Sequence, residues 1–176
     1  MASTKALLTT GIVYLRNLVA GSGGATFIPM GNLETADANV GTDADTLEKN
    51  LFAYTLPANT LKLGTVIEIY AYGVCAANAN VKTVRGYFGA ATQTAFSGAV
   101  NGSSWWIRIT VSQRATGNQS FCGRGGFAAS NATATSTTIG VDETATILLR
   151  VTGQNGTAVA NDLILHGGYV KISPAA

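Results

Sequence analysis

The feature that most constrains this chain is a period-two alternation of apolar and polar residues, which recurs between Leu51 and Ser173. In SWWIRITVSQRA (104–115), the large apolar side chains fall on every second position. Successive side chains of a β-strand point to opposite faces, so this spacing predicts a half-buried strand rather than a helix. For the adjacent Trp105 and Trp106, one ring must then face the core and the other must face outward.

Similar runs, separated by turns rich in Gly, Asn and Thr, predict further strands. They cover residues 51–56, 65–76, 81–89, 120–130, 142–153 and 163–173, with a weaker run at 11–19. Gly117 and Asn118 lie between two alternating runs and predict a hairpin turn. No window sustains a helical stripe. The sequence therefore predicts an all-β fold, an antiparallel β-sandwich of about eight strands, and that number of strands favours a jelly roll.

The N-terminal region differs from the rest because it is rich in glycine and has one strand-like run. We expect residues 1–46 to form an extended N-terminal arm that becomes ordered by lying on another surface, and residues 47–176 to form the sandwich domain. Five of the nine acidic residues lie between positions 31 and 48, while the rest of the chain carries all eleven Lys and Arg. An acidic arm and a basic body can attract each other, within one subunit or between neighbours. The alternative interpretation is that residues 31–48 form a solvated loop.

The composition bears on possible partners. Only 11% of the residues are charged and 47% are hydrophobic, so we expect copies of the chain or a larger assembly to cover part of its surface. A net charge of +2 is too small to predict nucleic-acid binding. No apolar run is long enough to predict a membrane-spanning helix.

Residues suited to catalysis are scarce. His166 is the only histidine, which excludes a site with several histidine ligands, and its apolar strand favours a structural or interface role. Adjacent Asp142 and Glu143 point to opposite faces if that segment is extended, so they cannot act together on one substrate. The GRGG run at 123–126 lacks the residues of a phosphate loop and predicts a bulge or a close backbone approach. We therefore predict no enzymatic activity, no cofactor and no metal.

The cysteines and the aromatic residues leave alternatives open. Cys75 and Cys122 are predicted to be buried free thiols, although a single disulfide is possible. Aromatic side chains could stack on a sugar ring, but packing in the core or at a subunit interface is the favoured interpretation. These side chains are Tyr70, Tyr72, Tyr87 and one of the two tryptophans.

A longer pattern resembles a known group of proteins. The string LFAYTLPANTLKLGTVIEIYAYGVCAANANVKTVRGYFG, followed by SWWIRITVSQRATGNQSF and ANDLILHGGYVKIS, resembles tailed-bacteriophage virion proteins. In that group a similar pattern opens a small β-sandwich of capsid decoration (cement) proteins and of fibre tips. The resemblance spans Leu51 to Ser173 and implies a structural protein of the virion. It would bind across junctions of the major capsid protein on the capsid surface and stabilise the shell.

The low charge and the separate arm suit a subunit that forms a homotrimer on such a lattice. An alternative remains, in which the chain is the receptor-binding tip of a tail or head fibre and recognises a host surface glycan. The residues that we expect at an interface are the following: Tyr14, Arg16, Glu34, Asp37, Asp43, Asp45, and either Trp105 or Trp106.

Overall fold

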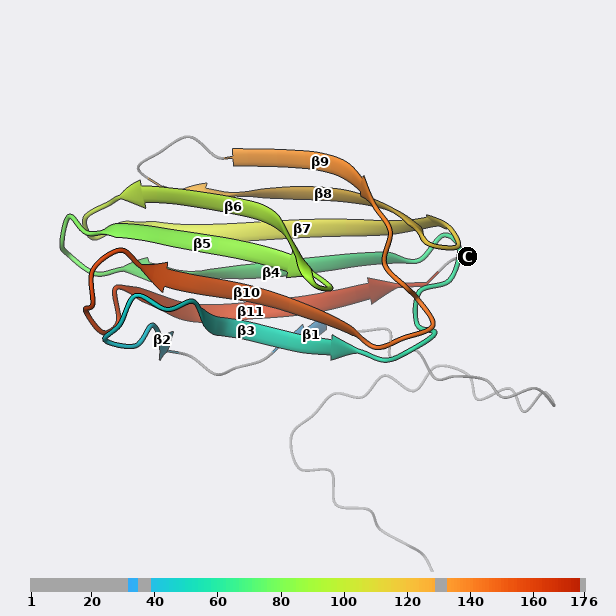
Figure 1. Cartoon of the computed structure of the whole chain (residues 1–176), viewed down its shortest axis with the longest axis horizontal. Coiled ribbons are helices and arrows are strands. Elements are labelled where there is room, and N and C mark those ends of the chain that lie inside the picture. The colour runs from blue at the N-terminus through green and yellow to red at the C-terminus, as the bar shows by residue number, and fades with distance from the viewer. Residues whose placement is uncertain (1–31, 35–38, 129–132, 175–176) are drawn as a thin grey trace, which may run out of the picture.

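A computed structural model describes residues 32–34, 39–128 and 133–174, and these residues form a two-layered sandwich of antiparallel strands (Figure 1). The prediction of an all-β antiparallel β-sandwich is confirmed. None of these residues is helical, so the part of the chain that is described contains no helix that could cross a membrane.

Eleven strands make up the two sheets. The larger sheet has the order β1-β11-β4-β7-β8-β9, with β2 also paired to β11. Its strands are β1 (Asn32–Glu34), β2 (Val40–Gly41), β4 (Val66–Cys75), β7 (Ser104–Ala115), β8 (Asn118–Phe127), β9 (Thr133–Ile139) and β11 (Leu163–Ser173). The smaller sheet has the order β3-β10-β5-β6. Its strands are β3 (Lys49–Leu56), β5 (Val81–Phe88), β6 (Ala91–Ala99) and β10 (Ile147–Asn155).

The strand pairings are nested along the chain. The outermost pairs join β1 and β2 to β11, the next joins β3 to β10, then β4 pairs with β7, and β5 pairs with β6. Strands β8 and β9 form an additional pair between β7 and β10. Strands β1 and β2, which fall within the expected arm, both pair with β11 of the sandwich. The remaining arm residues, 1–31 and 35–38, include the expected strand at 11–19 and lie outside the described residues.

The core lies between the two sheets, where the alternation predicted from the sequence directs the apolar side chains. On β7, Trp105, Ile107 and Ile109 are almost completely buried. Gly86 on β5 faces them, and a Cβ there would lie 2.8 Å from the Cδ1 of Ile107 and closer still to that of Ile109. Glycine at this position therefore allows the two sheets to approach each other.

The structure bears on three local predictions, the hairpin at Gly117, the GRGG run and the strand at 142–153. The hairpin is confirmed, since Gly117 has φ of 61° between β7 and β8. The GRGG run belongs to β8, where Gly125 packs against the Phe96 ring and the Trp106 carbonyl, so the close-approach alternative is the one observed. The strand expected at 142–153 begins only at Ile147. The carboxylate of Asp142 accepts hydrogen bonds from the N–H and the hydroxyl of Thr144, which holds the preceding residues in a turn.

A buried polar network stabilises one end of the sandwich. Lys82 is fully buried, and its Nζ lies 2.8–3.1 Å from the backbone oxygens of Asn78, Asn80 and Val100 and from Oδ1 of Asn78. The carboxylate of Asp162, also fully buried, accepts hydrogen bonds from the side-chain amides of Asn78 and Asn80, at 2.6 and 3.0 Å. The network thus connects the loop after β4 to the residue that precedes β11.

The two cysteines are both free. Cys75 is buried, and burial raises the pKa of its thiol to about 11. The expectation that Cys122 is also buried is wrong, because this residue lies on the outward side of β8, where the sheet is open to solvent.

Candidate functional site

The outer face of the larger sheet gathers four aromatic side chains, which we call the aromatic face: Tyr70 and Tyr72 on β4, Trp106 on β7 and Tyr169 on β11. The strand register places Tyr70 opposite Tyr169 and Tyr72 opposite Trp106. The ring centroid of Tyr70 is 5.7 Å from that of Tyr72 and 5.6 Å from that of Tyr169. Side chains that alternate along three neighbouring strands therefore form one continuous surface.

Glycines border this face on both sides. Gly167 is the register partner of Tyr72, and Gly126 is the register partner of Trp106. Neither glycine has a side chain that could cover the neighbouring ring. As a result, Tyr72 is 46% exposed, and Trp106 is only partly buried.

Glu68 lies on the same face and is held by two donors. The Tyr169 hydroxyl donates to Oε1 at 2.6 Å, and the Arg108 Nε donates to Oε2 at 2.8 Å, with a second contact from Nη2 to the same oxygen. Partial burial acts to raise the pKa of Glu68, but these hydrogen bonds and the charges of Arg108 and Lys171 outweigh burial and lower it. Glu68 is therefore a fixed carboxylate that orients Arg108.

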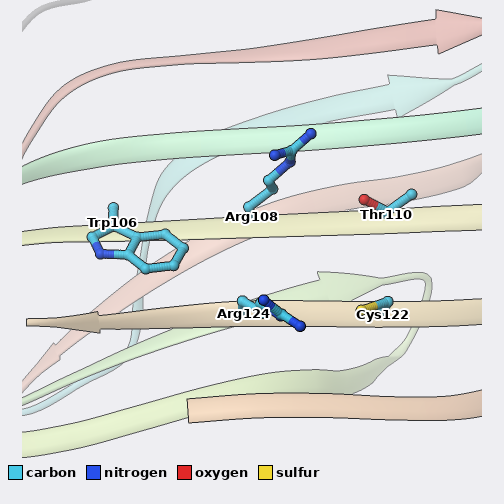
Figure 2. A pocket seen from close by; sticks show the side chains of 5 residues that line it. All are labelled: Trp106, Arg108, Thr110, Cys122 and Arg124. Atoms are coloured by element: carbon cyan, nitrogen blue, oxygen red, sulfur yellow. The ribbon is translucent and has the colours of Figure 1, made fainter. Parts of the chain in front are cut away.

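Beside Trp106, the face is hollowed (Figure 2). The hollow has a volume of about 320 Å³ and is lined by Trp106, Arg108, Thr110, Cys122 and Arg124. Arg108 and Arg124 are directly opposite each other on β7 and β8. Figure 2 shows the Arg108 side chain extending over β4, away from Arg124. Within the described ranges, the Arg124 side chain has no hydrogen-bond or ion-pair partner.

The groups on this face are of types that bind ligands. Both carboxylate oxygens of Glu68 accept hydrogen bonds from side chains of the same face. Among the residues that the structure describes, no three His, Cys, Asp or Glu side chains are grouped so that they could hold a metal ion. His166 is exposed at an irregularity of β11 and makes no hydrogen bond or ion pair with another described residue. Rings, guanidinium groups and a hydroxyl recognise ligands by stacking and hydrogen bonding.

The structure separates the two tryptophans. Trp105 is 1% exposed in the core, while Trp106 belongs to the aromatic face, as the alternation requires. Tyr87, another aromatic considered from the sequence, is buried against the smaller sheet and does not join this face.

Asp43 and Asp45, two of the acidic residues expected at an interface, lie away from the aromatic face. Asp43 forms an ion pair with Lys49 at 2.5 Å, and the carboxylate of Asp45 accepts a hydrogen bond from the N–H of Leu47. Glu34 belongs to β1, where its register partner is Tyr169. Neither Asp43 nor Asp45 lines the hollow. Tyr14, Arg16 and Asp37 lie outside the described residues.

Glu48, the last residue of the acidic region, binds the smaller sheet. It accepts hydrogen bonds of 2.5 Å from the hydroxyls of Tyr87 and Thr152, and it lies 3.4 Å from Arg85. The guanidinium carbon of Arg150 lies 4.0 Å from the centre of the Tyr87 ring. Partial burial acts to raise the pKa of Glu48, but its hydrogen bonds and the neighbouring arginines lower it. This acid is therefore used within the subunit.

Sequence reasoning did not single out Arg108, Arg124 or Tyr169. The two arginines carry only a weak signal, because the pairing of position 108 with position 124 depends on a register shift between Gln113 and Ala115 that the turn at Gly117 does not predict. Tyr169 carries no such signal, since its proximity to Tyr70 depends on the pairing of β11 with β4, which are far apart in the chain. Comparison with known proteins gives no further assignment: no family model matches this chain, and no curated protein matches its sequence.

Proposed function

We propose that this protein is a non-enzymatic structural component of a bacteriophage particle that decorates the capsid. In this proposal the subunits form an oligomer, a homotrimer, on the virion surface. They bind across junctions of the major capsid protein and stabilise the shell. Many copies, each with modest contacts, would stiffen the lattice through mass action and multivalency.

The observation that carries the proposal is the fold of the segment in which the resemblance lies. Residues Leu51 to Ser173 supply β4 to β11 and most of β3. The nested pairing of β2 with β11, β3 with β10, β4 with β7, and β5 with β6 supports a jelly roll, the fold that the resemblance implies. In this interpretation β8 and β9 are an added hairpin.

The edge of the larger sheet supports self-assembly. Strand β9 has the sequence TATSTTI, with no charged residue and no proline, and most of its side chains are exposed. Uncharged edge strands without proline pair readily with another chain, and monomeric proteins usually protect them. An oligomer in which β9 is covered would remove this exposed edge.

The proposal is tested on purified virions. Capsid decoration predicts hundreds of copies per particle by quantitative gel densitometry or cryo-EM, and particles that lack the protein should lose DNA at lower temperature than complete particles. Light scattering of the purified chain should give the mass of a trimer. A few copies per particle, located at a fibre, would contradict the proposal.

The aromatic face favours a second candidate, a receptor-binding tip that recognises a host surface glycan. Exposed Tyr, Trp and Arg are the residue types that contribute most to recognition at protein surfaces. Under this alternative, antibodies against the aromatic face should block adsorption of the phage to its host. Adsorption that is unchanged with saturating antibody would contradict it.

A further inference from the structure

The hollow beside Trp106 contains an electrostatic arrangement that the folded subunit does not satisfy by itself. Arg108 and Arg124 are direct cross-strand partners on the same face, and like charges in this position destabilise a sheet. Glu68 neutralises Arg108, whereas Arg124 has no ionic partner among the described residues. An anionic group bound in the hollow would supply the missing charge.

The other lining groups indicate what carries that anionic group. Trp106 borders the hollow with a partly exposed ring, and Gly126 beside it leaves the ring uncovered. Arg124 is a diagonal neighbour of Trp106, so their Cβ atoms are separated by about 7–8 Å. An aromatic ring can pack against the C–H face of a sugar residue, a guanidinium binds a carboxylate through two parallel hydrogen bonds, and the hydroxyl of Thr110 can bond to a sugar hydroxyl.

We propose that this hollow binds a carbohydrate chain that carries carboxylates, with the sugar ring on Trp106 and its carboxylate on Arg124. Arg108, held in place by Glu68, provides further N–H donors at the other side of the hollow. Tyr70, Tyr72 and Tyr169 extend the stacking surface along the chain of sugars. The inference goes beyond capsid decoration, since it assigns a ligand to a surface that decoration does not explain.

Two other occupants fit the hollow less well. Single-stranded nucleic acid also stacks on aromatic rings, but it requires a row of cations along its backbone, and here Glu68 lies among the few basic residues. An acidic segment of a second copy would need free carboxylates. Of the acids expected at an interface, Asp43 is paired with Lys49 and Asp45 is bonded to the backbone of its own chain.

The test uses the full-length protein and calorimetric titration with matched sugars. An oligogalacturonate is compared with its methyl ester, which keeps the sugar and removes the charge, and sialyllactose is compared with lactose. We expect saturable binding of at least one acidic sugar and at least tenfold weaker binding of its neutral counterpart. The two acidic sugars distinguish a uronate from a sialate as the source of the carboxylate. Because Trp105 is buried, any change of tryptophan emission on binding reports on Trp106.

Arg124→Gln is the decisive variant, since its side chain is exposed and its removal breaks no described contact. Loss of a charge-assisted bond should weaken binding of the acidic sugar by about tenfold to a hundredfold. Arg114→Gln, which removes an exposed arginine further along β7, is the matched control and should bind like the wild type. Circular dichroism of each variant establishes that it is folded.

Several results would overturn the proposal. They are equal affinity for the acid and its ester, an unchanged affinity in Arg124→Gln, and tighter binding of a single-stranded oligonucleotide than of any acidic sugar. Absence of sugar binding, together with self-association that Arg124→Gln abolishes, would instead identify the hollow as a contact between copies. The copy number per virion does not enter these measurements, so failure here is distinguishable from failure of capsid decoration.

Discussion

Replacing Lys82 with methionine removes the ammonium group from the buried network at the end of the sandwich. Methionine is similar in length and apolar, so the packing volume is largely preserved. However, the backbone oxygens of Asn78, Asn80 and Val100 lose the donor that they share. All three oxygens point at the fully buried Lys82 position, where methionine offers no donor to replace the lost hydrogen bonds.

The cost follows from the number of stranded acceptors. An unsatisfied buried polar group costs at least about 1 kcal/mol, so three carbonyls give about 3 kcal/mol. The same substitution spares the ammonium its own desolvation, which offsets the further loss at Oδ1 of Asn78 and keeps the expected cost at about 3 kcal/mol. A domain of typical stability, about 5–15 kcal/mol, remains folded after such a loss.

Urea denaturation, followed by circular dichroism, measures the effect. With a denaturant dependence of about 2 kcal/mol per molar urea, the midpoint should fall by about 1.5 M in Lys82→Met, with an unchanged slope. Lys62→Met is the control, because Lys62 is exposed, and it should change the free energy of unfolding by less than about 0.5 kcal/mol. A midpoint shift below about 0.3 M for Lys82→Met would refute the reasoning that Lys82 satisfies these acceptors.

Three further predictions concern packing, thiol chemistry and pH. Gly86→Ala should lower the free energy of unfolding by about 1–3 kcal/mol, because its Cβ would overlap core side chains. Gly98→Ala should be tolerated, because the Cβ there would make only ordinary contacts. Equal thermal midpoints of the two variants would contradict this prediction. At pH 8 a disulfide reagent should modify Cys122 at once but Cys75 only after denaturation. The absorbance of the released thiol should then correspond to one and later to two cysteines per chain. Rapid modification of both cysteines in the native protein would be inconsistent with the burial of Cys75. Since the pKa of Glu68 is lowered on folding, its contribution to stability is present above its unfolded pKa of about 4.3 and is lost as the pH falls through the folded value. The loss of stability between pH 7 and pH 3 should therefore be smaller in Glu68→Gln than in the wild type, as measured by urea titration at each pH.

Alternation was sufficient to predict the long half-buried strands. It located β4, β7 and β11 and determined which side of β7 faces the core. It did not predict β6, whose residues are mostly small or polar, or β9, whose side chains are mostly exposed. These strands are held by their neighbours in the sheet and not by a buried apolar face of their own, so their sequences lack the periodic signal.

The candidate site was only partly predictable. One of two adjacent tryptophans had to point outward, and the alternation indicates Trp106, since it shares its side of the strand with Arg108 and Thr110. The aromatic face also depends on the pairing of β4 with β11, whose partners are distant in sequence. Lys82 occupies a position that alternation assigns to the same side as Val84, yet its burial becomes understandable only when the surrounding carbonyl oxygens are known.

The nested order of the strands determines when the chain can complete its structure during synthesis. The innermost hairpin, β5 with β6, can form as soon as it leaves the ribosome, whereas β2 must wait for β11, the final strand. Such distant pairings make folding slow. Strand β11 lies between β2 and β4, so a nascent or truncated chain without it leaves β2 with no partner strand and β4 unpaired on one side. Incomplete chains would then expose open edges that aggregate, and only a chain translated through Ser173 could complete the larger sheet.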